Sequence, residues 1–173
     1  MMKKISIGIA LCLIIIAVAG YYILTQTLLK PKPVHYHAGF QVYVDDKLQD
    51  FSDFKYMHEK PCTLNGKPVD DHDDEQIEKA HLHDQIGDVV HVHRSGATWG
   101  DLFINLKYPL DEKQVVAYVH GVKADNILKQ TIKSYDSLVL FIGKHTDDKK
   151  YLEKAVTKDY IQKVEKKSEF CSS

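Results

Sequence analysis

Histidines are frequent in this sequence, and most of them come in pairs separated by one residue. The chain has 173 residues and ten histidines. Six of the ten form three His-x-His pairs: His35 and His37, His81 and His83, His91 and His93. Alternate side chains of a β-strand point to the same face, so a pair in a strand presents two imidazoles together. Imidazole nitrogens suit zinc and copper best, so these six residues are candidate metal ligands.

The spacing of the second and third pairs favours their convergence. Residues 84–88 have the composition of a five-residue hairpin loop, which would place His81 opposite His91, with His93 two positions further on. Directly opposed Cβ atoms lie about 5 Å apart and diagonal ones about 7–8 Å apart. Three or four imidazoles could then reach one ion at about 2 Å per bond. An HxH pair with a histidine on the next strand resembles the ligand geometry of α-carbonic anhydrases, a resemblance confined to that geometry.

Further residues could join or support such a site. Met57, His58 and Cys62 are close together in the sequence and offer softer ligands, which would favour copper. Asp84 could bind the ion or hold an imidazole in one tautomer, and Asp88 could serve in the second way. Three histidines with an open position would make a zinc hydrolase or hydratase conceivable, because such an ion activates water. Four or more histidines would make a closed binding site, and on balance the sequence favours binding over catalysis.

Two readings without a metal remain open. Histidines on the solvent face of a sheet would give a pH-responsive surface, or the domain could be a metal-free protein-interaction module. In addition, the acidic run before Glu75 predicts a short helix over Asp73–Ala80. If His81 ended that helix, the pair His81/His83 would not face one way, and the other two pairs would have to suffice.

Strand and helix patterns predict the elements that position the pairs. Residues 34–44 alternate, with apolar residues on one parity and His35 and His37 on the other, and residues 89–94 do the same. The histidines are therefore expected on the sheet face opposite a covering helix, open to solvent. Thr98 followed by Asp101 has the form of a capping box, which predicts a helix over 98–107. Residues 115–119 and 137–142 predict two more strands.

This order of elements predicts an α+β fold with a mixed β-sheet and one helix packed across it, similar in element order to the β-grasp, or ubiquitin-like, domain. We expect an anchor over residues 1–24, a linker over 25–33, a histidine-rich domain over 34–145 and a charged C-terminal helix and tail over 146–173. Within that last segment, apolar residues recur every four positions from Leu152 to Val164, which predicts a single amphipathic helix.

The N-terminus predicts a single membrane span. Residues 5–24 carry no charge and would form about 30 Å of helix, which matches the hydrocarbon core of a bilayer. Lys3 and Lys4 precede the segment, which favours a cytoplasmic N-terminus and an extracytoplasmic domain in the cell membrane. A cleaved signal peptide is the alternative.

Charge and cysteine content argue against two functional classes, nucleic-acid-binding proteins and thioredoxin-like redox proteins. Without Lys3, Lys4 and Lys30, the chain has 20 basic and 24 acidic residues, a net charge of −4, which argues against nucleic acid as a partner. There are three cysteines and no CxxC motif, so a thioredoxin-like redox site is not expected. A disulfide between Cys62 and Cys171 is possible outside the cytoplasm.

Several motifs together resemble a group of uncharacterised membrane-anchored proteins from bacteria and archaea. The shared pattern is HxHxxF, then HxHD, HVH and TxGDxF, carried here by residues 35–40, 81–84, 91–93 and 98–103. The resemblance implies the membrane-anchored architecture and a β-grasp-like domain, and it implies no established activity.

Overall fold

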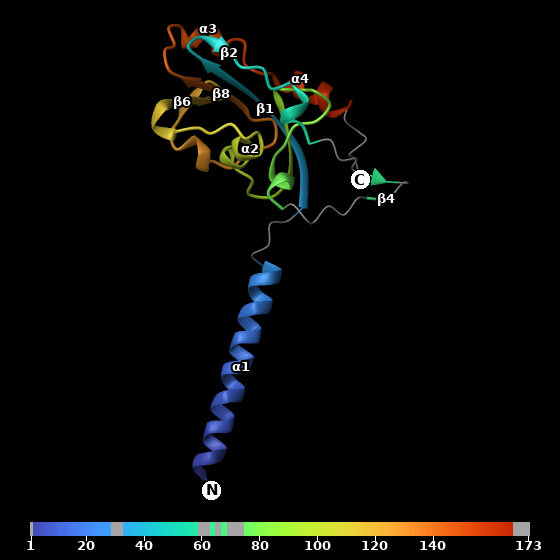
Figure 1. Cartoon of the computed structure of the whole chain (residues 1–173), viewed down its shortest axis with the longest axis vertical. Helices are drawn as coiled ribbons and strands as arrows, with labels where there is room; N and C mark the ends of the chain where they lie inside the picture. Colours follow the sequence, from blue (N-terminus) through green and yellow to red (C-terminus); the bar gives the residue numbers. More distant parts are fainter. Residues whose placement is uncertain (1, 29–32, 59–62, 65–66, 69–74, 168–173) are drawn as a thin grey trace. The chain divides into compact units, whose positions relative to one another are not determined.

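The computed structural model describes residues 2–28, 33–58, 63–64, 67–68 and 75–167 (Figure 1). The chain forms two compact units, residues 1–32 and residues 33–173. The first unit holds one helix, α1 (Met2–Leu28), which ends at Leu28 rather than at Leu24. Its segment Gly8–Thr25 is long and apolar enough to cross a membrane, a criterion that a signal sequence also meets.

The second unit is built on a mixed sheet. Its strands are β1 (Pro33–Val44), β2 (Lys47–Leu48), β5 (Val89–Arg94), β6 (Val115–Val119), β7 (Val122–Ala124) and β8 (Ser137–Ile142). The order across the sheet is β2-β1-β8-β6-β7, and β5 pairs with β1. Only the pairing of β1 with β8 is parallel; β1 with β2, β1 with β5, β6 with β8 and β6 with β7 are antiparallel. A separate small ladder joins β3 (Thr63–Leu64) and β4 (Lys67–Pro68).

The apolar face of β1 forms the main core, as its alternation predicts. Ala38, Phe40 and Val42 are fully buried there, because every second side chain of a strand points to one face. Helix α2 (Trp99–Asn105) covers this face and contributes three buried residues, Trp99, Leu102 and Phe103. The predicted capping box is present: the Thr98 side chain accepts from the Asp101 N–H, and the Asp101 carboxylate accepts from the Thr98 N–H.

Short turns set the register of the two hairpins. Asp45 and Asp46 both have positive φ (47° and 63°), and they join β1 to β2. His120 and Gly121, with φ of 51° and 75°, join β6 to β7 in the same way. Two consecutive residues of positive φ match the right-handed twist of paired strands, which is why both turns are short.

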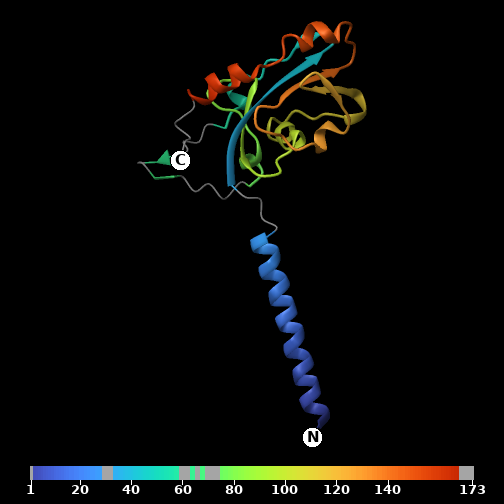
Figure 2. The ribbon, with the colours of Figure 1, turned by 180° about the vertical axis from the view of Figure 1, so that it is seen from behind.

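The opposite face of the sheet is covered by the C-terminal segment (Figure 2). The prediction of one helix here is wrong: the structure has α3 (Asp148–Leu152) and α4 (Lys158–Glu165). The chain breaks between them because Thr157 caps α4, its side chain accepting from the Tyr160 N–H. Val156, in the break, lies against Gly39 of β1 so closely that any side chain at Gly39 would collide with it.

The helix predicted over Asp73–Ala80 is also wrong in the part that the structure describes. Residues 73 and 74 lie outside the described residues, and the segment that follows contains only one 3-10 turn, η2 (Ile77–Lys79). Three further 3-10 turns are η1 (Phe54–Tyr56), η3 (Glu112–Gln114) and η4 (Ile127–Lys129). Because Ala80 is already extended, His81 does not end a helix, and its pair is free to face one way.

Candidate metal centre

Strand β5 lies between β1 and the extended segment that carries His81 and His83. On one side His91 is the register partner of His37. On the other side His91 is the bridge partner of His81, as the sequence predicts, and the two residues exchange both backbone hydrogen bonds, at 3.0 and 2.8 Å. Strand β1 and two segments about 50 residues further along the chain therefore place their histidine pairs side by side.

The alternation of side chains puts all three pairs on one face. Val90 and Val92 of β5 are fully buried in the main core, so His91 and His93 point to the opposite face. Leu82 is buried in the same core, which turns His81 and His83 the same way. We refer to the imidazoles of His35, His37, His81, His83, His91 and His93 as the six-histidine cluster.

Within the cluster the ligand atoms fall into two groups of three. The first group consists of His35, His37 and His91, and the second of His81, His83 and His93. In each group the potential ligand nitrogens all lie within 4.8 Å of one another. Either group could hold a metal ion, since three imidazoles at such distances need only small movements to bind a common ion at about 2 Å.

The rings form two rows across the three segments. In one row the His35, His93 and His81 rings are stacked, with centroids 4.9 and 5.1 Å apart along the row. In the other, the His37, His91 and His83 rings meet edge to face, with centroids 4.2 and 4.6 Å apart. The two groups are thus in direct contact through neighbouring rings.

Most of the cluster is buried, which corrects the expectation of a face open to solvent. His37, His81, His83 and His91 are 0%, 4%, 8% and 1% exposed, His93 is half-buried, and only His35 is exposed. The cause is the C-terminal segment, because α4 lies beside β1 and packs through Ile161 and Val164 with Val89 of β5 (Figure 2). Access to the cluster from solvent is therefore on the side of His35 and His93.

The hydrogen bonds of His81 prepare one of its ring nitrogens for a cation. Its Nδ1 lies 2.8 Å from the carbonyl oxygen of Ile77, and because a carbonyl only accepts, Nδ1 must donate. In a neutral ring Nε2 then carries a lone pair, and it faces Nε2 of His83 at 2.7 Å. A carbonyl that fixes the tautomer of a histidine is the usual outer partner of a metal ligand.

A carboxylate approaches the cluster on its other side, at an ion-pair distance from the His37 ring. Glu165, at the end of α4, places Oε1 3.5 Å from Nδ1 of His37, whose Nε2 faces Nδ1 of His91 at 3.0 Å. The Nε2 atom of His93 is buried, and the described residues give it no hydrogen-bond partner. A buried polar atom without a partner is costly, and a bound cation would satisfy it.

Burial keeps these imidazoles neutral. It lowers the pKa of His83 to about 4 and that of His93 to about 3, with smaller effects from neighbouring groups. For His81 and His91, burial and then the adjacent histidines hold the pKa well below the usual range. Since a metal binds the unprotonated imidazole, the cluster is in its ligand form at neutral pH.

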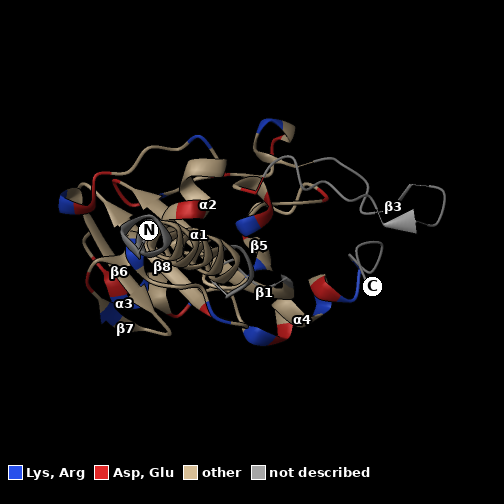
Figure 3. Cartoon of the chain, turned by 90° about the horizontal axis from the view of Figure 1, so that it is seen from below, with Lys and Arg blue, Asp and Glu red and all other residues tan. Residues whose placement is uncertain are grey.

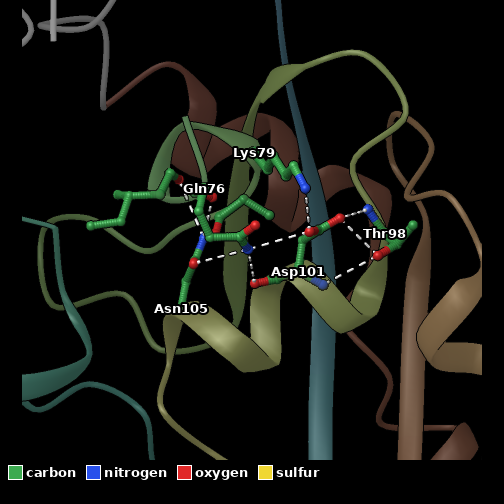
Figure 4. A network of polar contacts seen from close by, with 7 residues as sticks. Gln76, Lys79, Thr98, Asp101 and Asn105 are labelled. Carbon is green, nitrogen blue, oxygen red and sulfur yellow. Dashed lines mark hydrogen bonds and ion pairs between the residues drawn. The ribbon is translucent and has the colours of Figure 1, made fainter. Parts of the chain in front are cut away.

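A polar network fixes the segment that leads into His81 (Figure 4). The Asn105 side-chain amide, on α2, donates to the carbonyls of Gln76 and Ala80 at 2.9 and 2.7 Å. Asp101, one turn earlier on the helix, accepts from the Lys79 ammonium at 2.8 Å. The capped helix α2 thereby holds the 76–80 segment, which carries the carbonyl that orients His81.

The other described residues that the sequence suggested as additional ligands lie outside the two groups of three. The His58 ring lies beside the cluster, with its centroid 5.1 Å from that of His81 and 6.3 Å from that of His83. Met57 packs against the main core, and Asp84 is exposed with positive φ; neither belongs to the groups of three among the described residues. Cys62 lies outside the described residues.

Sequence reasoning missed the residues that support the cluster. Glu165 has no signal of its own because its contact with His37 depends on how distant segments pack, and the Ile77 carbonyl has none because its contact with His81 depends on the 3-10 turn η2. Asn105 did have one: Asp101 and Asn105 are four positions apart, which puts both on the same side of a helix. Asp88, considered as an orienting residue, instead accepts a hydrogen bond from the Tyr160 hydroxyl at 3.3 Å.

We predict that Asn105→Ala destabilises the domain by about 1–3 kcal/mol, because the carbonyls of Gln76 and Ala80 lose their shared donor. Ile104→Ala on the same helix is the control, since Ile104 is 64% exposed and its truncation should change little. Chemical denaturation of the full chain in detergent measures both. Equal stability of the two variants would show that the network does not hold this segment.

The lowered pKa values also predict an acid-labile metal-free protein. Below about pH 6.5 the unfolded chain protonates its histidines while buried His83 stays neutral down to about pH 4. The unfolded state then binds more protons, so the free energy of unfolding falls as the pH falls, by about 1.4 kcal/mol per pH unit for each such histidine. Denaturation in EDTA between pH 7.5 and 5 measures this, and His83→Gln should reduce the slope. A slope of zero would contradict the burial of the cluster.

Searches against protein-family models, curated proteins and solved structures found no match to this chain, so its function is inferred from the geometry of the cluster.

Proposed function

We propose that this chain is a membrane-tethered, extracytoplasmic domain that binds zinc or copper through His-x-His pairs on adjacent strands. The observation that carries the proposal is the convergence of six imidazoles into two groups with ligand nitrogens within 4.8 Å. Seven of the ten histidines, including His58, contact one another, which far exceeds what a solvated strand face requires.

The chemistry of the donors supports a transition metal over a hard cation. Every residue of the two groups is histidine, and imidazole nitrogen suits zinc and copper, whereas calcium and magnesium prefer oxygen. The outer partners support binding too, because the Ile77 carbonyl fixes the tautomer of His81 and the Glu165 carboxylate lies 3.5 Å from Nδ1 of His37. Burial of these rings without an ion would leave unsatisfied nitrogens in a dry region.

The surrounding architecture agrees with a small binding domain. The strand order β2-β1-β8-β6-β7, with β1 and β8 parallel and α2 across one face, supports the β-grasp-like assignment. Basic and acidic residues are interspersed over the domain in the view of Figure 3 rather than gathered on separate sides, which gives no support to a nucleic-acid partner.

The proposed metal centre predicts the metal content of the protein. The full chain, purified in detergent, should contain near-stoichiometric zinc or copper, and a variant with His81, His83, His91 and His93 changed to alanine should contain none. His120→Ala is the matched control, since this histidine is 58% exposed and outside the cluster. Elemental analysis measures all three. Wild-type protein that carries no metal, and takes up none on titration with either ion, would refute the proposal.

Residues Gly8–Thr25, preceded by Lys3 and Lys4, support a membrane span with the domain outside the cytoplasm, and we infer that the span is uncleaved. We predict that a membrane-impermeant maleimide labels Lys123→Cys on intact cells, in a chain whose own cysteines are replaced by serine, because Lys123 is exposed. Labelling only after lysis would reverse the orientation. The mass of the purified chain shows separately whether residues 1–24 are retained.

A further inference from the structure

The two groups of the cluster are built in the same way. Each takes both histidines of one pair and one histidine of β5: His91 joins the β1 pair, and His93 joins the pair His81/His83. This follows from the position of β5 between the other two segments. No residue belongs to both groups, so filling one with an ion leaves the other with its three ligands.

From this division we propose that the cluster holds two copper(I) ions, one in each group of three histidines, a proposal that rests on the metal-binding function above. The groups are in contact through the rings of His91 and His83, at 4.6 Å, and of His35 and His93, at 4.9 Å. The two ions are therefore close neighbours.

Charge is the first argument for the monovalent ion. Among the described residues the two groups contain only imidazoles and no carboxylate ligand, and Glu165 lies 3.5 Å from Nδ1 of His37, at the edge of the first group. Two zinc ions would bring four positive charges into a largely buried region, whereas two copper(I) ions bring two. Close like charges away from water repel strongly, so the lower total is favoured.

Coordination number is the second argument. Protein zinc is almost always four-coordinate, so a three-histidine zinc site needs a further ligand such as water. Copper(I) is satisfied by three nitrogen ligands. In the second group, His81 and His83 are 4% and 8% exposed, which confines the water that zinc would require to the side of His93.

The exposure gradient gives the ions a route into the cluster. His35 is exposed and His93 is half-buried, and their rings are stacked on the accessible side, one from each group. An incoming ion can bind either residue first and then reach the two buried histidines of the same group. Because the groups share no residue, neither site requires the other to be filled.

Anaerobic titration of the full chain in detergent with copper(I), against a chromophoric copper(I) chelator, tests the proposal. We expect two equivalents for the wild type and for His120→Ala. We expect one equivalent for His35→Ala, which removes an exposed ligand of the first group, and one for His93→Ala, which removes the least buried ligand of the second. Circular dichroism checks that each variant is folded.

A measurement without substitutions accompanies the titration. Copper K-edge absorption of the loaded wild type should show three nitrogen ligands per copper at about 2 Å. If one equivalent binds to the wild type and both variants lose it, a single centre uses histidines of both groups, which overturns the two-ion proposal and leaves the metal-binding function intact. Uptake of zinc without copper(I) also overturns the proposal of two copper(I) ions, but not the metal-binding function. Uptake of neither ion overturns both proposals.

Discussion

The pairing of β5 on both of its edges is the constraint on which the rest of the domain depends. His91 is the backbone partner of His37 on one edge and of His81 on the other. A shift of one residue in either register would turn Val90 and Val92 out of the main core and the histidines into it. The same hydrogen bonds therefore fix the core and the cluster together, because the two are opposite faces of the same three segments.

The apolar core on one face of the sheet offsets the cost of burying the histidines on the other face. The cluster buries nitrogen atoms, which lowers stability in the absence of an ion, and the fully buried Phe40, Trp99 and Leu82 lie directly behind it. Helix α2 takes part in both layers: Trp99 and Leu102 pack in the core, while Asn105 fastens the segment before His81. The position of a ligand pair is thus determined by the packing of a helix on the far side of the sheet.

Local patterns predicted the parts of the fold that depend on local physics. Strand alternation placed β1 and β5, the capping box placed α2, and the loop length placed His81 opposite His91. The errors came where distant packing decides. The apolar residues of the C-terminal segment recur with the period of one helix. However, Val156 packs against Gly39, and the helix is interrupted there. That same packing buries the histidine face, which no pattern within β1 could indicate. The division of the histidines into two groups likewise needs the position of every segment.

The contact between Glu165 and His37 joins residues 128 positions apart, and it has a consequence for the order in which the domain is made. During synthesis β1 is the first strand of the domain to emerge. Its parallel neighbour β8, and the helix α4 that lies beside it, emerge about 100 residues or more later. Contacts over such separations form slowly, because the chain between them must first be ordered. The nascent chain therefore passes through a long interval in which the histidines of β1 are exposed, and the protected cluster exists only once the residues through α4 have been released.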